Sequence, residues 1–284
     1  MNRDSLAGRW LGVIVPIAVV WVVSVVVSGL TVGYIRYLWL PRAGAGMSPF
    51  DQEALWRAKY ADSRLLITAV GDCVIILYGL FARRRALSSE LVPAMPERLP
   101  ARVLLWMPFL GAAVCLFVNL VFTFTGLTVL LARDYEAMGE ALFPEGQTAL
   151  TVVTVGLLAP AAEELIFRGV VFPRLRGAYR GLMPAVFSAV LFGAYHGNLA
   201  QGLYAFFLGL LFAFGYEKTG WFSAALLMHI FANACSAALT LLPTGLTTGQ
   251  LLGLMFASGA VLAAGCGRLA RLSADRTEPT AGQM

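Results

Sequence analysis

The sequence predicts an all-α fold: a polytopic bundle of about eight membrane-spanning helices with a polar cavity inside it. Two observations predict the bundle. Hydrophobic residues make up 59% of the 284-residue chain and charged residues only 13%, whereas soluble domains carry about 25% charged residues. In addition, eight apolar stretches have lengths near the roughly 20 residues that a helix needs to cross a bilayer. They lie at about Trp10–Tyr34, Leu65–Phe81, Val103–Leu131, Thr148–Phe172, Leu182–His196, Leu199–Tyr216, Trp221–Leu242 and Leu251–Leu269.

These stretches divide the chain into three predicted parts. Residues 1–147 carry the first three spans, and we expect Ile35–Arg64, which mixes aromatic and charged residues, to form a helix at the membrane interface. Residues 148–242 carry four spans and form the predicted reactive core. Residues 243–284 carry the last span and a polar tail from Ser273 that we expect to be disordered. The fifth span is short, and the Gly197-Asn198 break after it is compatible with a loop or a re-entrant turn.

The distribution of basic residues predicts the orientation. The net charge of +5 comes largely from Lys and Arg in short segments between apolar stretches, such as Arg83-Arg84-Arg85. Such clusters are typical of cytoplasmic loops rather than of a nucleic-acid-binding stripe, so we expect no nucleic-acid partner. With the N-terminus inside, most of the 21 Lys and Arg residues fall on the cytoplasmic side. We therefore expect both termini in the cytoplasm and the lipid bilayer as the surroundings of the bundle.

The cysteines do not indicate a cross-linked or metal-binding scaffold. They are far apart and all lie within apolar stretches, at Cys73, Cys115, Cys235 and Cys266. Because no C-x-x-C spacing occurs, the sequence supports neither a disulfide framework nor a zinc knuckle. We expect these side chains to act as small apolar packing residues.

Ionisable residues inside membrane spans are costly, so each is by default a functional hypothesis. The fourth span contains Glu163, Glu164 and Arg168. Glu164 and Arg168 are four residues apart, so they share a helix face and can form an ion pair. Glu163 points about 100° away from Glu164, because a helix has about 3.6 residues per turn, and is left free for proton transfer. Pro160, three residues earlier, predicts a kink that makes room for water.

The chain has two histidines, and both lie in membrane spans. His196 ends the fifth span, while His229 stands four residues before Asn233 in the seventh, so the latter two share a face and can donate to the same group. At ~1.5 Å per residue, the histidines, Asn233 and Glu163 lie about 12–18 Å below the cytoplasmic surface. A single membrane histidine can simply form an interhelical hydrogen bond, but four groups at a similar depth favour one common site. Asp72 in the second span is compatible with either a functional or a packing role.

These polar residues form an ordered pattern on three spans: E-E-x-x-x-R, then F-x-x-x-H, then H-x-x-x-N. The motifs comprise Glu163-Glu164 with Arg168, Phe192 with His196, and His229 with Asn233. The pattern resembles the CAAX-processing and bacteriocin-processing (CPBP) intramembrane endopeptidases, which are related to the Ras-converting enzyme. The resemblance covers roughly residues 148–240. Each motif alone is weak, but the ordered set on separate spans is specific.

The resemblance implies a hydrolase, an intramembrane CAAX-type protease of the glutamate class. The residues with direct roles would be Glu163, His196, His229 and Asn233. The first two would activate a water molecule for attack on a peptide carbonyl, and the last two would stabilise the resulting oxyanion. Glu164 and Arg168 would support the shape of the helix and the cavity.

A zinc site is the competing interpretation of the same residues. Two histidines and a glutamate are zinc-ligand types, and three protein ligands with a water form a catalytic zinc pattern. However, H-E-x-x-H is absent, and the resembling family is described as glutamate-type. We therefore favour a mechanism that uses no metal or other cofactor.

The resemblance also implies the class of substrate, a membrane-associated peptide or protein. Candidates are prenylated C-terminal tails, bacteriocin-type leader peptides and C-terminal membrane sorting signals. The compact chain and short loops favour a bacterial inner (plasma) membrane protein, for which a prenylated substrate is less favoured. A different class stays open, a transporter or a non-catalytic scaffold that binds a ligand or partner. An inverted repeat would favour transport, and none is evident; the sequence defines no oligomeric state.

Overall fold

The computed structural model describes residues 6–142, 148–239 and 245–275. All regular secondary structure in these ranges is helical, which confirms the predicted all-α class. The first part contains α1 (Leu6–Gly33), the π-helix η1 (Tyr34–Trp39), α2 (Leu40–Ala43), α3 (Pro49–Leu87), the 3₁₀-helix η2 (Ala101–Trp106), α4 (Met107–Phe124), α5 (Leu127–Leu130) and α6 (Ala132–Leu142). The remainder contains α7 (Thr148–Val153), the π-helix η3 (Thr154–Leu158), α8 (Ala159–Ile166), the π-helix η4 (Phe167–Val171), α9 (Phe172–Ala178), α10 (Met183–Tyr195), α11 (Leu199–Thr219), α12 (Phe222–Leu239) and α13 (Thr248–Ala274).

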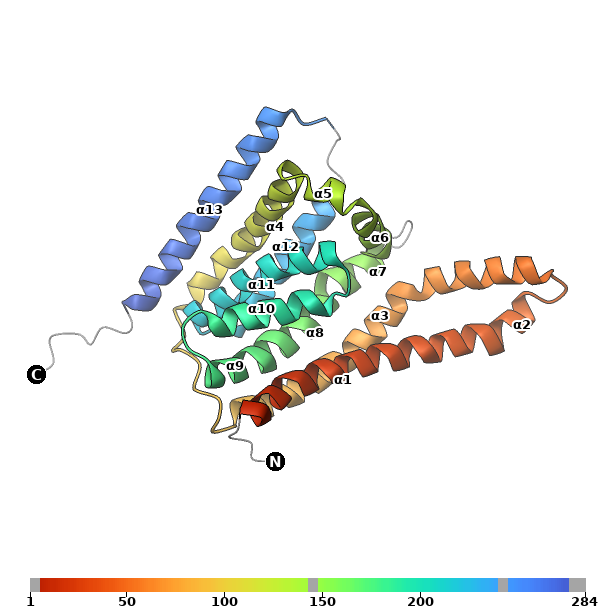
Figure 1. Ribbon diagram of the computed structural model, residues 1–284, viewed down its shortest axis with the longest axis horizontal. Coiled ribbons are helices and arrows are strands. Elements are labelled where there is room, and N and C mark those ends of the chain that lie inside the picture. Colours follow the sequence, from red (N-terminus) through yellow and green to blue (C-terminus); the bar gives the residue numbers. More distant parts are fainter. Residues whose placement is uncertain (1–5, 143–147, 240–244, 276–284) are drawn as a thin grey trace, which may run out of the picture.

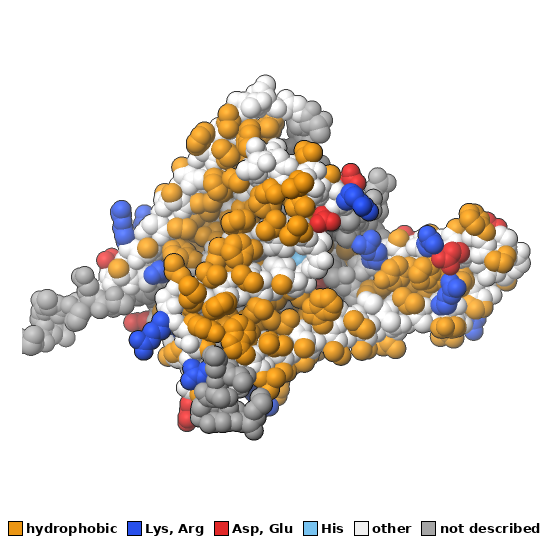
Figure 2. All heavy atoms as spheres, in the orientation of Figure 1, with side chains coloured by type: hydrophobic (Ala, Val, Ile, Leu, Met, Phe, Trp, Pro, Cys, Tyr) orange, Lys and Arg blue, Asp and Glu red, His pale blue; other side chains and the backbone are white. Residues whose placement is uncertain are grey.

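In the described part of the chain, seven helical segments are long and apolar enough to cross a membrane, and α10 is a shorter apolar helix. Together they confirm the prediction of about eight apolar segments. Figure 1 shows a central group of helices with α13 along one side and the long pair α1 and α3 along the other. Large hydrophobic side chains cover much of the surface, as Figure 2 shows for one face. Such extensive apolar exposure suits a surface that faces lipid.

Residues 35–64 form the tip of a helical hairpin. η1 and α2 continue α1, and after a short turn α3 runs for 39 residues without a break. Ser48 starts α3 by accepting a hydrogen bond from the backbone N–H of Asp51. The segment is therefore helical, as expected, but it is divided between two long helices instead of forming one of its own. At ~1.5 Å per residue α3 is about 58 Å long, nearly twice the ~30 Å hydrocarbon core, and the hairpin projects beyond the bundle (Figure 1).

The third span ends earlier than its apolar run suggests. α4 stops at Phe124 because Gly126 takes a left-handed conformation with φ of 76°, which glycine adopts readily. The apolar residues up to Leu130 then form the separate short helix α5. At the other end of the chain, α13 continues through Ser273 to Ala274. The predicted boundary at residues 242–243 and the rest of the expected tail, residues 276–284, lie outside the described residues.

Close packing fixes α12, the helix that carries His229 and Asn233. Gly111 of α4 lies against its backbone, and a Cβ at this glycine would stand 2.1 Å from the carbonyl oxygen of Met228. The missing side chain lets the two helices approach as small residues do in membrane bundles. Buried Phe212 of α11 and Met228 belong to the same core cluster. α12 is therefore held by α4 on one side and α11 on another.

The helix that carries the two glutamates is irregular at both ends. α8 is preceded by the π-helix η3 and followed by the π-helix η4. Pro160 stands in the first turn of α8, where it cannot donate a backbone hydrogen bond. The kink predicted at Pro160 falls next to the point where the π-helix η3 ends and the α-helix α8 begins. π turns of this kind often occur at functional sites.

A tight turn joins α10 to α11. His196 caps the end of α10, Gly197 has a φ of 76°, and the side chain of Asn198 caps α11 by accepting from the backbone N–H of Gln201 at 2.7 Å. The two helices lie side by side (Figure 1). With 13 residues, α10 is about 20 Å long at ~1.5 Å per residue, shorter than the ~30 Å hydrocarbon core. The turn therefore brings His196 into the interior of the bundle.

Candidate active site

A cavity of about 200 Å³ lies among α3, α8, α10, α11 and α12. Side chains from these helices, and from α4 and α6, line it, so it is assembled from parts of the chain far apart in sequence. Its polar lining residues are Thr68, Asp72, Asn119, Tyr135, Glu163, Tyr195, His196, Gln201, Tyr204, His229, Asn233 and Ser236. The structure thus brings together all four residues that the sequence predicts as directly reactive.

His229 lies between the two glutamates of α8. Its Nδ1 is 2.9 Å from Oε1 of Glu164, and its Nε2 is 3.7 Å from Oε2 of Glu163. The side chain of Glu163 is 17% exposed, whereas that of Glu164 is fully buried. Glu163 therefore lines the cavity. Glu164 does not line it, but contacts the lining residue His229.

The predicted ion pair between Glu164 and Arg168 is present and fully buried. Arg168 Nη1 donates to Glu164 Oε1 at 2.8 Å, and its Nη2 donates to the carbonyl oxygen of Gly209 at 3.0 Å. The guanidinium also packs over the rings of Phe192 and Phe212, 4.5 and 5.3 Å from their centres. These contacts offset part of the cost of burying a charge. Arg168 consequently connects α8 to α10 and α11 at the base of the site.

The hydrogen bonds of Glu164 define which nitrogen of His229 carries a proton. Glu164 Oε1 accepts from Arg168 and faces His229 Nδ1, and a carboxylate paired with arginine is an acceptor. Nδ1 of His229 is therefore a donor. Its Nε2, which faces Glu163, carries a hydrogen only in the imidazolium form.

His196 is oriented by its own helix. Its Nδ1 is 2.8 Å from the carbonyl oxygen of Phe192, and because a carbonyl can only accept, Nδ1 is the protonated nitrogen of the neutral ring. Nε2 is then left with a free lone pair. The rings of Phe192 and Tyr195 pack edge-on against the imidazole. His196 is therefore arranged as a base or hydrogen-bond acceptor.

Asn233 ties α12 to the π-helix that precedes α8. Its Nδ2 donates to the carbonyl oxygen of Val155 at 2.8 Å. An amide NH₂ has two hydrogens, so this bond leaves one for a group in the cavity. His229 and Asn233 both line the cavity, as expected for residues four apart on one helix.

Asp72, for which the sequence is compatible with a functional or a packing role, lies in the cavity wall. It is 8% exposed, and its Oδ2 is buried without a hydrogen-bond partner among the described residues. Asp72 and Glu163 are close enough to interact as like charges. The signal in the sequence for Asp72 is a charged residue inside a membrane span. Tyr204 is a further lining residue, for which the sequence carries no signal; its hydroxyl lies 3.4 Å from Nδ2 of Asn119.

The same side chains can be compared with a zinc site. Among the described residues, no group of three or more His, Cys, Asp or Glu side chains is arranged to hold a metal ion. Nδ1 of each histidine is within hydrogen-bonding distance of a protein oxygen, so Nε2 is the nitrogen of each ring that is left for a group in the cavity.

A small substitution beneath the site should test how tightly Arg168 is held. A Cβ at Gly209 would lie 2.9 Å from Nη2 of Arg168 and 3.1 Å from the ring of Phe192. Because both side chains are clamped, we expect Gly209→Ala to destabilise the protein by about 1–3 kcal/mol, measured by denaturant unfolding in detergent. Gly267→Ala in α13 is the matched control: its Cβ would meet nothing within 4 Å, so no loss is expected. Equal stability of the two variants would contradict the packing described above.

Comparison with known proteins finds a similarity over part of the chain. Residues 145–235 match the family model described as type II CAAX prenyl endopeptidase Rce1-like. No curated protein and no solved structure matches the chain. The matched residues include Glu163, Glu164, Arg168, His196, His229 and Asn233. The match confirms the resemblance inferred from the three motifs: residues 145–235 are similar to the Rce1-like endopeptidases of the CPBP family.

Proposed function

We propose that the protein is a glutamate-type intramembrane endopeptidase that hydrolyses a peptide bond of a membrane-associated peptide or protein. The main support is the convergence of Glu163, His196, His229 and Asn233, from three helices, on one cavity of about 200 Å³. The Rce1-like match over the same residues supports the endopeptidase class independently. A cavity of this size holds a few water molecules, which the reaction needs and the bilayer does not supply.

In the proposed reaction, Glu163 and His196 activate one water molecule. The water transfers one proton to the carboxylate of Glu163, while its other hydrogen stays on the oxygen and donates a hydrogen bond to Nε2 of His196, which has a free lone pair. The water oxygen forms a bond to the carbonyl carbon, and the carbonyl oxygen becomes an oxyanion. When the C–N bond breaks, the proton held by Glu163 passes to the leaving nitrogen, so the products are a carboxyl group and an amine.

His229 and Asn233 stabilise the oxyanion in this proposal. Asn233 has one amide hydrogen left beyond its bond to Val155. His229 donates from Nε2 in its imidazolium form, while its Nδ1 is held 2.9 Å from Oε1 of Glu164. Glu164 thus gains a positioning role: it orients the ring of His229 toward the cavity.

The proposal extends to the class of substrate and to the membrane in which the protein lies. We propose a membrane-associated peptide or protein as substrate, with a bacteriocin-type leader peptide or a C-terminal membrane sorting signal preferred over a prenylated tail. The distribution of Lys and Arg supports cytoplasmic termini in a bacterial inner membrane. The start of α1 and the end of α13 lie toward the same side of the bundle in Figure 1, which is consistent with that topology.

Cleavage in a defined membrane tests the proposal. The purified protein in nanodiscs, incubated with a library of membrane-anchored peptides, should yield fragments that mass spectrometry detects. Exhaustive chelation should leave the rate unchanged, whereas a zinc enzyme would lose activity and regain it with added Zn²⁺.

A variant purified in the same way controls for contaminating proteases. Asn233→Ala removes one proposed oxyanion donor and should lower kcat by about 10²–10³. If wild-type protein and variant leave every peptide intact, the cavity is better explained as a ligand- or partner-binding site.

A further inference from the structure

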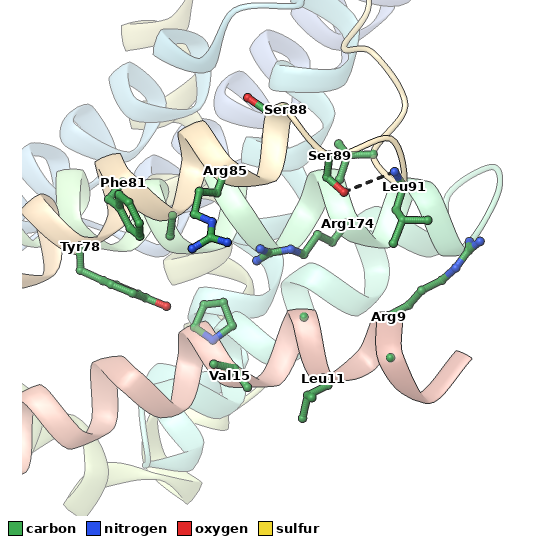
Figure 3. Close-up of a pocket in the computed structure, with 15 residues that line it drawn as sticks. Arg9, Leu11, Val15, Tyr78, Phe81, Arg85, Ser88, Ser89, Leu91 and Arg174 are labelled. Atoms are coloured by element: carbon green, nitrogen blue, oxygen red, sulfur yellow. Dashed lines mark hydrogen bonds between the residues drawn. The ribbon is translucent and has the colours of Figure 1, made fainter. Parts of the chain in front are cut away.

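A second and larger cavity lies away from the candidate active site. It has a volume of about 710 Å³ and is enclosed by the first half of α1, the end of α3 with the segment after it, and α9 (Figure 3). It shares no lining residue with the first cavity. Because α1 begins and α3 ends here, the cavity lies where these two membrane helices terminate, the level at which lipid headgroups surround a bundle.

The wall of this cavity carries positive charge without a balancing acid. Arg9, Arg85 and Arg174 line it, and none of the described lining residues is acidic. The side chains of Arg85 and Arg174, from α3 and α9, point toward each other (Figure 3), and they interact as like charges. Two guanidinium groups that face each other repel unless an anion lies between them.

The hydrogen bonds of the arginines show which of them can still donate to a bound ligand. Arg9 donates to the carbonyl oxygen of Gly177 and so fastens α1 to α9. Nη1 of Arg174, in contrast, is buried and has no hydrogen-bond partner among the described residues. Arg176, two residues further along, is paired with Glu217 at 2.8 Å. A buried donor without an acceptor is costly, and a phosphate oxygen would remove that cost at Arg174.

The rest of the wall is apolar and open toward the bilayer. Leu11, Val15 and Phe81 line the cavity and are 45–58% exposed. The charged and apolar walls are therefore continuous. Such a surface fits a molecule with an anionic phosphate at one end and hydrocarbon chains at the other, which is the chemistry of a phospholipid.

We propose that this cavity binds an anionic phospholipid, with the phosphate between Arg85 and Arg174 and the acyl chains along Leu11, Val15 and Phe81. Phosphate oxygens form strong charge-assisted hydrogen bonds with arginine. The lack of a described acidic lining residue disfavours a zwitterionic headgroup, whose cation would have no partner. The bound lipid bridges α1, α3 and α9, and the proposal does not depend on the proposed endopeptidase activity.

Lipid titration of the full-length protein tests this site. Dioleoyl-phosphatidylglycerol is added to the protein in a non-ionic detergent, and native mass spectrometry measures the fraction with bound lipid. Arg85→Gln and Arg174→Gln should each weaken binding about tenfold, the loss expected for a charge-assisted hydrogen bond. Arg84→Gln is the matched control, because Arg84 is on the same last turn of α3 but does not line the cavity. It should bind as the wild type does.

Two further arms distinguish the source of the phosphate. Dioleoyl-phosphatidylcholine should bind more weakly than phosphatidylglycerol, and millimolar inorganic phosphate should not displace the lipid. Equal affinity for the two lipids, or displacement by inorganic phosphate, would overturn the assignment to an anionic phospholipid. Unchanged phosphatidylglycerol binding by Arg85→Gln would overturn the site itself; since Arg85 is exposed, this variant should fold normally, which its unfolding midpoint checks.

Discussion

Glu163→Gln should lower kcat/KM for peptide cleavage by about 10²–10⁴, the range that a general base contributes. Gln is nearly the same size and still forms hydrogen bonds, but it cannot take a proton from water. Because the Glu163 side chain lies 3.7 Å from His229 and forms no ion pair with Arg168 in the structure, the fold should be little affected. Cleavage is measured with the nanodisc assay, and folding by the unfolding midpoint.

A carboxylate far from the cavity supplies the control for this variant. Glu53, near the tip of the α1–α3 hairpin, pairs with Arg36 and Arg57 on the surface, so Glu53→Gln should leave cleavage unchanged. Wild-type kcat/KM in Glu163→Gln would remove Glu163 from the proposed chemistry. An equal loss in both variants would point to a general effect of removing a charge.

Arg168→Met should produce the largest loss of stability. It keeps the length of the side chain but leaves the buried Glu164 carboxylate without its cationic partner, and breaking a buried pair in this way costs about 3–5 kcal/mol. Both members of the pair are fully buried, so water cannot replace the lost contact. Denaturant unfolding in detergent should show the decrease as a lower midpoint.

The double variant Glu164→Gln/Arg168→Met separates this charge effect from lost packing. With the carboxylate also removed, no uncompensated charge remains, and Gln can still accept from His229 Nδ1. The double variant should therefore be more stable than Arg168→Met alone. If the two are equally unstable, packing of Arg168 against Phe192 and Phe212 accounts for the loss.

Much of the candidate site could be predicted because its signals are local. The spacing of Glu164 and Arg168, and of His229 and Asn233, places each pair on one helix face whatever the tertiary structure. Counting residues from the expected membrane surface gave a similar depth for the polar groups. The contacts within the Glu164–Arg168 pair, and the shared cavity, agree with that reasoning.

The remaining features depend on how helices meet, which spacing does not determine. The contact of Glu164 with His229 joins residues 65 positions apart and requires a particular rotation of α8 against α12. Asp72 reaches the cavity because α3 packs against α8, and no motif marks it. The hairpin formed by residues 35–64 was not predicted, because its charged and aromatic residues are equally typical of an interfacial helix.

The π turns on both sides of α8 determine the direction in which the side chains of α8 point. A π turn contains one residue more than the α turn it replaces, so the residues after it are rotated by about 100° relative to a continuous α-helix. A related chain with one residue fewer in η3 would keep the E-E-x-x-x-R motif unchanged. The glutamate equivalent to Glu163 would nevertheless face a different neighbour. Recognising the motif in a related sequence is therefore not enough to infer an assembled site; the number of residues between Val155 and Glu163 has to be preserved as well.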